Sequence, residues 1–168
     1  MEREEVPVFD PKTLEIIGTK YRDELTKEDI HGIVCVIVEN SARQIFMQVR
    51  SHTKKLYPGA FDLSASGFVR AGERFEESAS RELAEEIGLI VDPSELSEKL
   101  VFRGMLAPSE YPCYTCVYKV QTDEPPLTLT DEVEDGKWFV LNELRTAMQV
   151  QPKSFTQLAP LVLNQVYP

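Results

Sequence analysis

The chain has 168 residues, 42% hydrophobic and 27% charged, a composition typical of a folded protein with one sizeable core. Its formal net charge of -10 argues against a general nucleic-acid binder, because phosphate contacts require clustered Lys and Arg. Its three cysteines, with neither a signal peptide nor a long apolar run, argue against a secreted or membrane-spanning protein and predict a cytoplasmic one.

The first elements in chain order are two short strands. Residues 6–9 and 14–17 carry apolar side chains on either side of the turn-forming stretch 10–13, which predicts a β-hairpin. We expect a single domain over residues 1–168, in which residues 1–30 form this hairpin extension before the main fold.

The main fold is predicted to begin with strands. The run 33–38 is apolar at every position, which indicates a central strand covered on both faces. A second strand is predicted over 44–50, and a third over 61–65 after the loop at 57–59.

A helix is predicted from about Arg74 to Ile87, and Gly88 is a good C-terminal stop for it. Residues 92–95 predict a turn. The remaining elements are strands over 99–106 and 114–121, a loop from Asp123 to Trp138, and helices over 141–148 and 155–166. Strands followed by closing helices favour a mixed sheet covered on both faces, in the α/β class.

Three glutamates gather on the predicted helix. At about 100° per residue, Glu82, Glu85 and Glu86 fall within roughly 100° of one another. Carboxylates this close repel each other, and a protein tolerates that repulsion most readily when a divalent cation lies among them; oxygen ligands favour magnesium or manganese over zinc. The helix is therefore predicted to hold Mg²⁺ or Mn²⁺, with a solvated acidic helix as the alternative.

The glutamates belong to a longer pattern of fixed spacing. Its positions are Gly67, Glu73, Arg81, Glu82, Leu83, Glu85, Glu86, Gly88 and Leu89. This pattern resembles, with no position missed, the signature of the Nudix hydrolase superfamily. The resemblance implies a Nudix-type α/β/α sandwich with a mixed β-sheet, here preceded by the N-terminal β-hairpin extension.

The resemblance also implies roles for single residues. The implied metal-binding set is Gly67, through a backbone carbonyl at or next to it, with Glu82, Glu85 and Glu86. The implied catalytic set is Glu85, Glu86 and Glu132, in which Glu85 is either a ligand or the group that orients the attacking water.

Two supporting roles follow from the same resemblance. Arg81 and Glu73 are expected to form an ion pair that supports the site. Among the acidic residues before Trp138, which are Asp131, Glu132 and Glu134, we prefer Glu132 as a later ligand or base, and a solvated acidic loop is the alternative.

A second segment indicates which branch of the superfamily the chain resembles. Residues 48–59, QVRSHTKKLYPG, with His31 upstream, are similar to the isopentenyl-diphosphate isomerase branch of the superfamily. The similarity implies that Arg50 and Lys54 bind the diphosphate through exposed, mobile side chains; a solvated strand end is the alternative.

The isomerase reaction itself is not expected from this chain. The isomerases use a Cys and a Glu to move protons, and a His-rich metal site. The aligned positions here hold Ser66 in place of the Cys and Phe68 in place of a metal-binding His.

The sequence thus predicts a metal-dependent hydrolase of a diphosphate linkage in a nucleoside diphosphate derivative. Its substrate would be a small phosphorylated molecule, and we expect a monomer or homodimer with no membrane and no general nucleic-acid partner. The alternatives are an isopentenyl-diphosphate isomerase and a non-catalytic Nudix-like metabolite sensor. The missing Cys argues against the first, and the intact glutamate cluster argues against the second.

Overall fold

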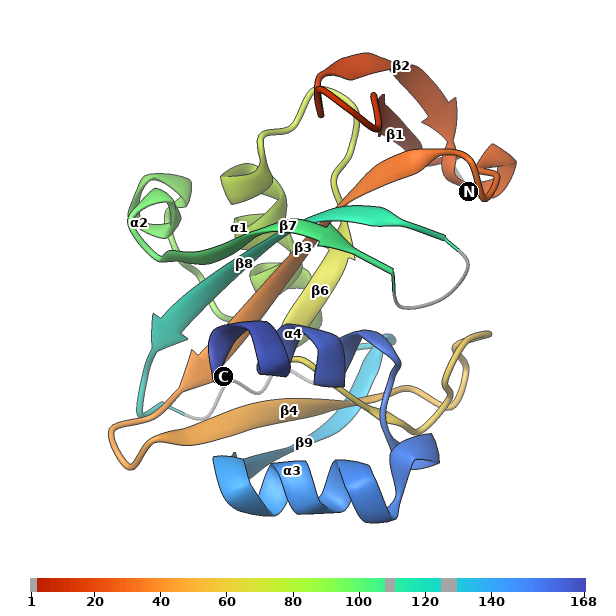
Figure 1. The fold of residues 1–168 in the computed structure, drawn as a ribbon. Helices are drawn as coiled ribbons and strands as arrows, with labels where there is room; N and C mark the ends of the chain where they lie inside the picture. Colours follow the sequence, from red (N-terminus) through yellow and green to blue (C-terminus); the bar gives the residue numbers. More distant parts are fainter. Residues whose placement is uncertain (1–2, 108–110, 125–129) are drawn as a thin grey trace.

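The described part of the chain, residues 3–107, 111–124 and 130–168 of the computed structural model, contains nine strands and four α-helices (Figure 1). The strands are β1 (Glu5–Phe9), β2 (Ile16–Tyr21), β3 (Ile30–Glu39), β4 (Gln44–Arg50), β5 (Phe61–Asp62), β6 (Ala65–Phe68), β7 (Leu100–Leu106), β8 (Cys113–Gln121) and β9 (Val133–Val140). The helices are α1 (Phe75–Ile87), α2 (Pro93–Ser97), α3 (Leu141–Val150) and α4 (Leu158–Val166), with 3-10 turns η1 (Arg22–Glu24) and η2 (Pro152–Ser154).

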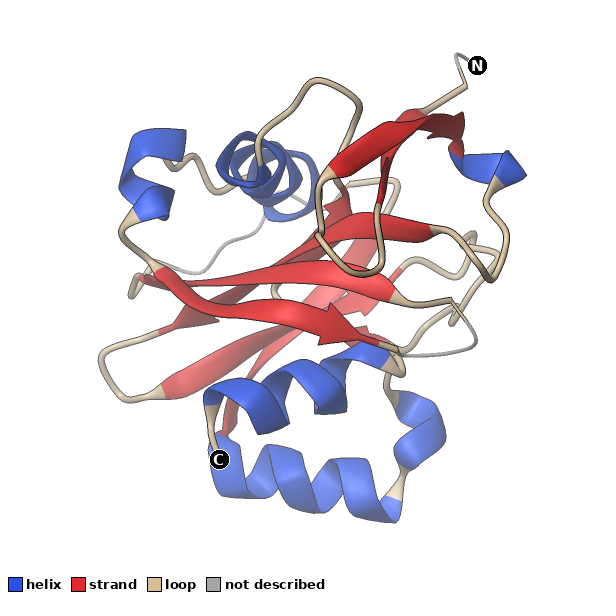
Figure 2. Cartoon of the chain, turned by 45° about the horizontal axis from the view of Figure 1, so that its top comes forward, coloured by secondary structure: helices blue, strands red, loops and turns tan. Residues whose placement is uncertain are grey.

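The predicted central strand is confirmed, because every residue of β3 is buried. Its odd-numbered side chains, such as Cys35 and Ile37, pack in the core under α3 and α4. Its even-numbered side chains, such as Val34 and Val36, pack under α1 and α2. Figure 2 shows these helix pairs on opposite faces of the sheet. Since β8 runs parallel to β3 and β6 antiparallel, the fold is an α/β/α sandwich with a mixed sheet, as predicted.

The sheet divides into two arms. We call β3, β6 and β8 the β3 arm, and β4, β5 and β9 the β4 arm. In the described structure, β3 and β4 pair only at Glu39 and Ile45, next to the turn that joins them, and beyond that point β6 replaces β4 beside β3. The arms therefore diverge from the β3–β4 turn (Figure 1).

Ser64 bridges the arms close to this turn. Its Oγ accepts a hydrogen bond from the Val38 backbone N–H at 2.8 Å and donates one to the Phe46 carbonyl at 2.6 Å. Because Ser64 serves both arms in this way, it lies outside either ladder. The single strand predicted over 61–65 is accordingly replaced by two short strands, β5 and β6.

The predicted N-terminal hairpin is confirmed as β1 and β2. The Asp10 side chain accepts hydrogen bonds from the backbone N–H groups of Lys12 and Thr13, each at 2.8 Å, and so fixes the turn. β1 then joins the main sheet by pairing with β3 at Val8 and His31.

Two predicted segments are wrong. Residues 92–95 open the short helix α2 rather than a turn, because the Asp92 side chain caps the Ser94 backbone N–H at 2.8 Å with Pro93 at the first helical position. The loop predicted to reach Trp138 ends earlier, since β9 begins at Val133; residues 125–129 of that loop lie outside the described residues. Within the described ranges, no helix has the length and apolar content needed to cross a bilayer.

Candidate functional site

Helix α1 carries the glutamates, and its two ends are well defined. At its start the Arg74 backbone N–H donates to Glu77 Oε2 at 2.8 Å, and Gly88 ends it in the left-handed conformation, with φ of 70°. The predicted boundaries are thus confirmed to within a residue. The apolar stripe next to the glutamates is buried: Ala79, Leu83 and Ile87. This burial fixes the face on which Glu82 and Glu86 point into the protein.

Glu86 lies between the two arms of the sheet. Only 3% of it is exposed, and its Oε2 accepts hydrogen bonds from Gln48 Nε2 at 2.8 Å and from the Ser66 backbone N–H at 2.9 Å. Burial raises the pKa of Glu86 well above its ordinary value, and nearby Glu82 raises it further. No Lys or Arg in the described residues pairs with this carboxylate.

Glu82 lies against the backbone of β6. It is 7% exposed, and a Cβ added to Gly67 would lie 2.0 Å from Glu82 Oε1, so only glycine leaves room for the carboxylate here. Burial raises the pKa of Glu82 to about 7; Arg81 opposes this rise, and Glu85 and Glu132 add to it. Glu132 therefore contributes to the electrostatic field of the helix glutamates, although it is far away in the sequence.

Arg81 forms the ion pair predicted for it. Its Nε lies 2.9 Å from Glu73 Oε1, and its Nη2 lies 3.0 Å from Glu73 Oε2, which makes the pair bidentate. The same guanidinium donates to the Phe68 carbonyl at 3.0 Å and to Glu82. Arg81 thus links α1 to the end of β6 through its hydrogen bond to Phe68.

Glu85 faces outward. Its side chain is 50% exposed, and its Oε2 lies 3.3 Å from Arg81 Nη1 and 3.6 Å from Arg70 Nη2. No three acidic, His or Cys side chains of the described residues are gathered closely enough to surround one ion in this conformation. Of the residues predicted to bind the metal, Glu82 and Glu86 are the buried carboxylates, and Gly67 lies directly against Glu82.

The structure brings Lys54 and Glu132 together, as two predicted site residues from distant parts of the sequence. Lys54 Nζ lies 2.6 Å from Glu132 Oε2, and the Ser51 backbone N–H donates to the Glu132 carbonyl at 2.9 Å. Next to them, His52 Nδ1 lies 2.6 Å from Glu134 Oε1. These contacts join the loop after β4 to the start of β9.

Arg50 is not the exposed, mobile side chain that the sequence predicts. Its side chain is 17% exposed; Nη1 lies 3.1 Å from Asp62 Oδ2, and Nε donates to the Leu56 carbonyl at 3.2 Å. Asp62 is buried and also accepts a hydrogen bond from Thr156 Oγ1 at 2.8 Å. The expectation is wrong because this buried carboxylate holds the guanidinium inside the protein.

Two residues of this region are absent from the predicted site. Gln48 and Asp62 lie opposite each other in the β4–β5 ladder. The only sequence signal for Gln48 is a long polar side chain in a strand whose neighbouring residues, such as Phe46 and Met47, are apolar and buried.

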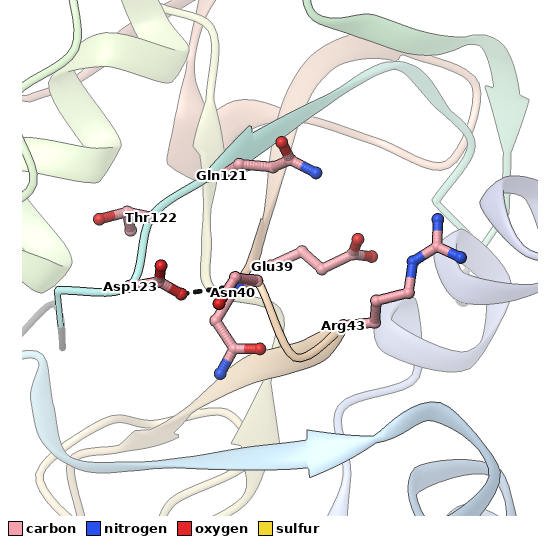
Figure 3. Close-up of a pocket in the computed structure, with 7 residues that line it drawn as sticks. Glu39, Asn40, Arg43, Gln121, Thr122 and Asp123 are labelled. Atoms are coloured by element: carbon pink, nitrogen blue, oxygen red, sulfur yellow. Dashed lines mark hydrogen bonds between the residues drawn. The ribbon is translucent and has the colours of Figure 1, made fainter.

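A surface hollow at the β3–β4 turn contains none of the predicted site residues. Figure 3 shows the side chains around it, and it is lined by Glu39, Asn40, Ser41, Arg43, Gln121, Thr122 and Asp123. It lies where the arms meet, whereas Glu86 contacts the arms after they have separated. The site is therefore defined by the buried carboxylates and not by this hollow.

Comparisons with known proteins show the family of the chain. The NUDIX domain family model matches residues 29–159. A Nudix hydrolase of Deinococcus radiodurans is 28% identical over 153 residues, 88% of this chain and 86% of that protein. An isopentenyl-diphosphate Delta-isomerase of Photorhabdus laumondii is 28% identical over 137 residues, 80% of this chain and 76% of that protein.

Solved structures share the fold. A crystal structure of a Deinococcus radiodurans protein has a TM-score of 0.80 at 24% identity and covers 98% of this chain and 100% of that chain. A bifunctional NMN adenylyltransferase/ADP ribose pyrophosphatase of Francisella tularensis, complexed with AMP and a Mn ion, has a TM-score of 0.60 at 17% identity. That likeness covers 82% of this chain and 42% of the other.

Proposed function

Since this chain belongs to the NUDIX domain family, we propose that it hydrolyses a diphosphate linkage in a nucleoside di- or triphosphate or a similar derivative, using Mg²⁺ or Mn²⁺. Membership makes the chain a Nudix pyrophosphohydrolase, a class that acts on pyrophosphate bonds in nucleotide derivatives. The particular substrate and the metal requirement are the proposed part.

Glu86 gives this proposal its strongest support. A carboxylate that is almost fully buried, with hydrogen-bond donors on one oxygen and no described cation beside it, is costly unless a cation arrives from outside. Glu82, Glu86 and the carbonyl at or beside Gly67 would hold the ion, with Glu85 at the exposed side. When bound, a divalent ion neutralises phosphate oxygens and makes a water molecule more nucleophilic.

The protein's own side chains would divide the remaining tasks. Glu85 or Glu132 would orient the attacking water and take its proton. Arg50, already held through Nε and Nη1, would present Nη2 to a phosphate oxygen. Lys54 would exchange its pairing with Glu132 for the substrate phosphate, which would free Glu132 for the water.

A screen of purified protein tests this function. Nucleoside di- and triphosphates and diphosphate-linked nucleotides are incubated with Mg²⁺, with Mn²⁺ or with EDTA, and the release of phosphate, nucleotide and pyrophosphate is measured. We expect at least one compound to be hydrolysed with metal and not with EDTA. If no compound is hydrolysed with either metal, the non-catalytic sensor becomes the better account.

The isomerase is the second candidate, because one relative carries that name. The same screen includes isopentenyl diphosphate, with the dimethylallyl product as the readout. We expect none above background, since Ser66 and Phe68 replace the Cys and His that the reaction uses. Formation of that product at an enzymatic rate would favour the isomerase instead.

A further inference from the structure

Gln48 is one of the largest fully buried side chains of the described protein, and only one end of its carboxamide is satisfied. It is 1% exposed, and its Nε2 donates to Glu86 Oε2 at 2.8 Å. Its Oε1 has no hydrogen-bond partner among the described residues. An unpaired buried carbonyl of this kind is destabilising, so a partner for it is expected in the working protein.

The orientation of this carboxamide is dictated by chemistry. A cation-binding Glu86 is ionised and can only accept, so the amide nitrogen of Gln48 faces Glu86 in that state. Exchanging the two ends of the amide then cannot satisfy Oε1. Gln48 Oε1 is therefore unpaired because Gln48 Nε2 donates to Glu86.

The hydrogen bonds to Glu86 come from both arms of the sheet. Glu86 Oε2 accepts one from Gln48 Nε2 in the β4 arm and one from the Ser66 backbone N–H in the β3 arm. Both donors bind the same carboxylate oxygen, and Glu86 Oε1 makes no hydrogen bond to any described group. The two arms thus fix one oxygen of Glu86 and leave the other for a ligand.

We propose that Gln48 is a positioning residue of the metal site, which fixes Glu86 through Nε2 and accepts, at Oε1, a hydrogen bond from a water of the ion's hydration shell. Magnesium keeps several of its waters when proteins bind it, so such a donor arrives with the ion. Partners of this kind, which act through a ligand, commonly change metal affinity by tenfold to a hundredfold. This inference rests on the proposed function, because it requires that Glu86 binds a divalent ion.

The test measures the affinity of the full chain for Mn²⁺ alone by titration calorimetry, so that it does not depend on turnover. Gln48→Met removes both polar ends with little change in volume. Gln44→Met makes the same change at the start of the same strand, where the Gln44 side chain accepts a hydrogen bond from Asn40 Nδ2 in the β3–β4 turn, away from Glu86. We expect Gln48→Met to weaken Mn²⁺ binding at least tenfold, and Gln44→Met to leave it within about twofold.

Metal-free stability separates positioning from a merely structural role. If Gln48→Met lowers the unfolding free energy but binds Mn²⁺ as tightly as the unaltered chain, the inference is overturned and the proposed function stands. If the unaltered chain binds no Mn²⁺, the proposed function fails and the inference falls with it. Should Gln48→Met not fold, Gln48→Asn is used; it keeps the amide but withdraws it by one methylene, and the same loss of affinity is expected.

Discussion

Arg50 and Lys54 share a predicted role in phosphate binding but have different surroundings. Arg50 pairs with buried Asp62, so Arg50→Ala leaves a buried carboxylate without its cation and should lower the unfolding free energy by about 3–5 kcal/mol. Lys54 pairs with the half-exposed Glu132, so Lys54→Ala should cost less than about 1 kcal/mol. Urea denaturation of both variants measures the difference.

A double variant tests the reason for the Arg50 effect. If the cost comes from stranded Asp62, then Arg50→Ala combined with Asp62→Asn should recover part of the loss, which is the coupling expected of a direct pair. Two results would show that Asp62 does not depend on Arg50. One is an equal loss of unfolding free energy in Arg50→Ala and Lys54→Ala. The other is a loss in the double variant that equals the sum of the losses in Arg50→Ala and Asp62→Asn.

His31 should make the folding stability of the protein fall at moderately acid pH. Its ring is buried and stacks on Phe68, with ring centroids 4.9 Å apart, and burial lowers its pKa from 6.5 to about 4. Between these values the unfolded chain binds a proton that the folded chain does not. The contribution of neutral His31 to the unfolding free energy is therefore fully present above pH 6.5 and is lost as the pH falls toward 4.

The expected loss from His31 is about 2 kcal/mol by pH 5, at about 1.4 kcal/mol for each pH unit below the unfolded pKa. Urea denaturation near pH 7.5 and pH 5 measures it, with His31→Asn as the non-titrating comparison. The drop between the two pH values should be smaller in His31→Asn. The same drop in both proteins would mean that other groups cause it.

At the level of elements, the parts with a strong local pattern are predictable from sequence. Helix α1 has its glutamate spacing and Gly88, and β3 is apolar throughout, so their positions are confirmed. The sequence does not predict strand β9, because among the described strands it pairs only with β4, and an edge strand with one solvent-facing side carries polar residues. Its sequence, VEDGKWFV, therefore resembles a loop.

The supporting parts of the site depend on tertiary structure. The shared helix face of Glu82 and Glu86 is predictable from helical spacing. The Arg81–Glu73 ion pair, implied by the family resemblance, is confirmed. Gln48 reaches Glu86 only because the two arms of the sheet diverge around the carboxylate. No local periodicity encodes that divergence, so neither Gln48 nor Asp62 could be assigned from the sequence.

The contact between β6 and α1 gives a prediction about both elements. Gly67→Ala would place a Cβ 2.0 Å from Glu82 Oε1, so the Glu82 carboxylate must move while the helix backbone stays. Hydrolysis and Mn²⁺ affinity should each fall at least tenfold, whereas the melting temperature should change by only a few degrees. Gly18→Ala is the matched control, because nothing lies within 4 Å of a Cβ added there.

Steady-state kinetics, calorimetry and a thermal melt of the two glycine variants provide the comparison. If Gly67→Ala kept full activity and Mn²⁺ affinity, the position of the Glu82 carboxylate would not matter for the reaction. If instead it lost most of its stability, the glycine would serve packing rather than the site.

For the whole molecule, the charge distribution and the arrangement of the sheet both indicate the region around Glu86 as the site. The chain carries a net charge of -10, which disfavours a polyanionic substrate over most of its surface. Arg81 pairs with buried Glu82, Arg50 with Asp62 and Lys54 with Glu132, so these cations oppose the negative field around the predicted site residues. The two arms, covered by helices on both faces, let α1 insert Glu86 between them.

The most direct test of the central claim, that a divalent ion on α1 drives hydrolysis, compares Glu86→Gln with the unaltered protein across a Mg²⁺ titration, using the best substrate from the screen. Turnover should fall at least about a hundredfold, or about 3 kcal/mol of barrier, while the metal-free melting temperature is not lowered, since a nearly isosteric amide replaces a buried charge. Glu76→Gln, on the same helix but outside the cluster, should keep its activity. Equal turnover in Glu86→Gln and Glu76→Gln would contradict the account and leave α1 as an acidic helix without a metal.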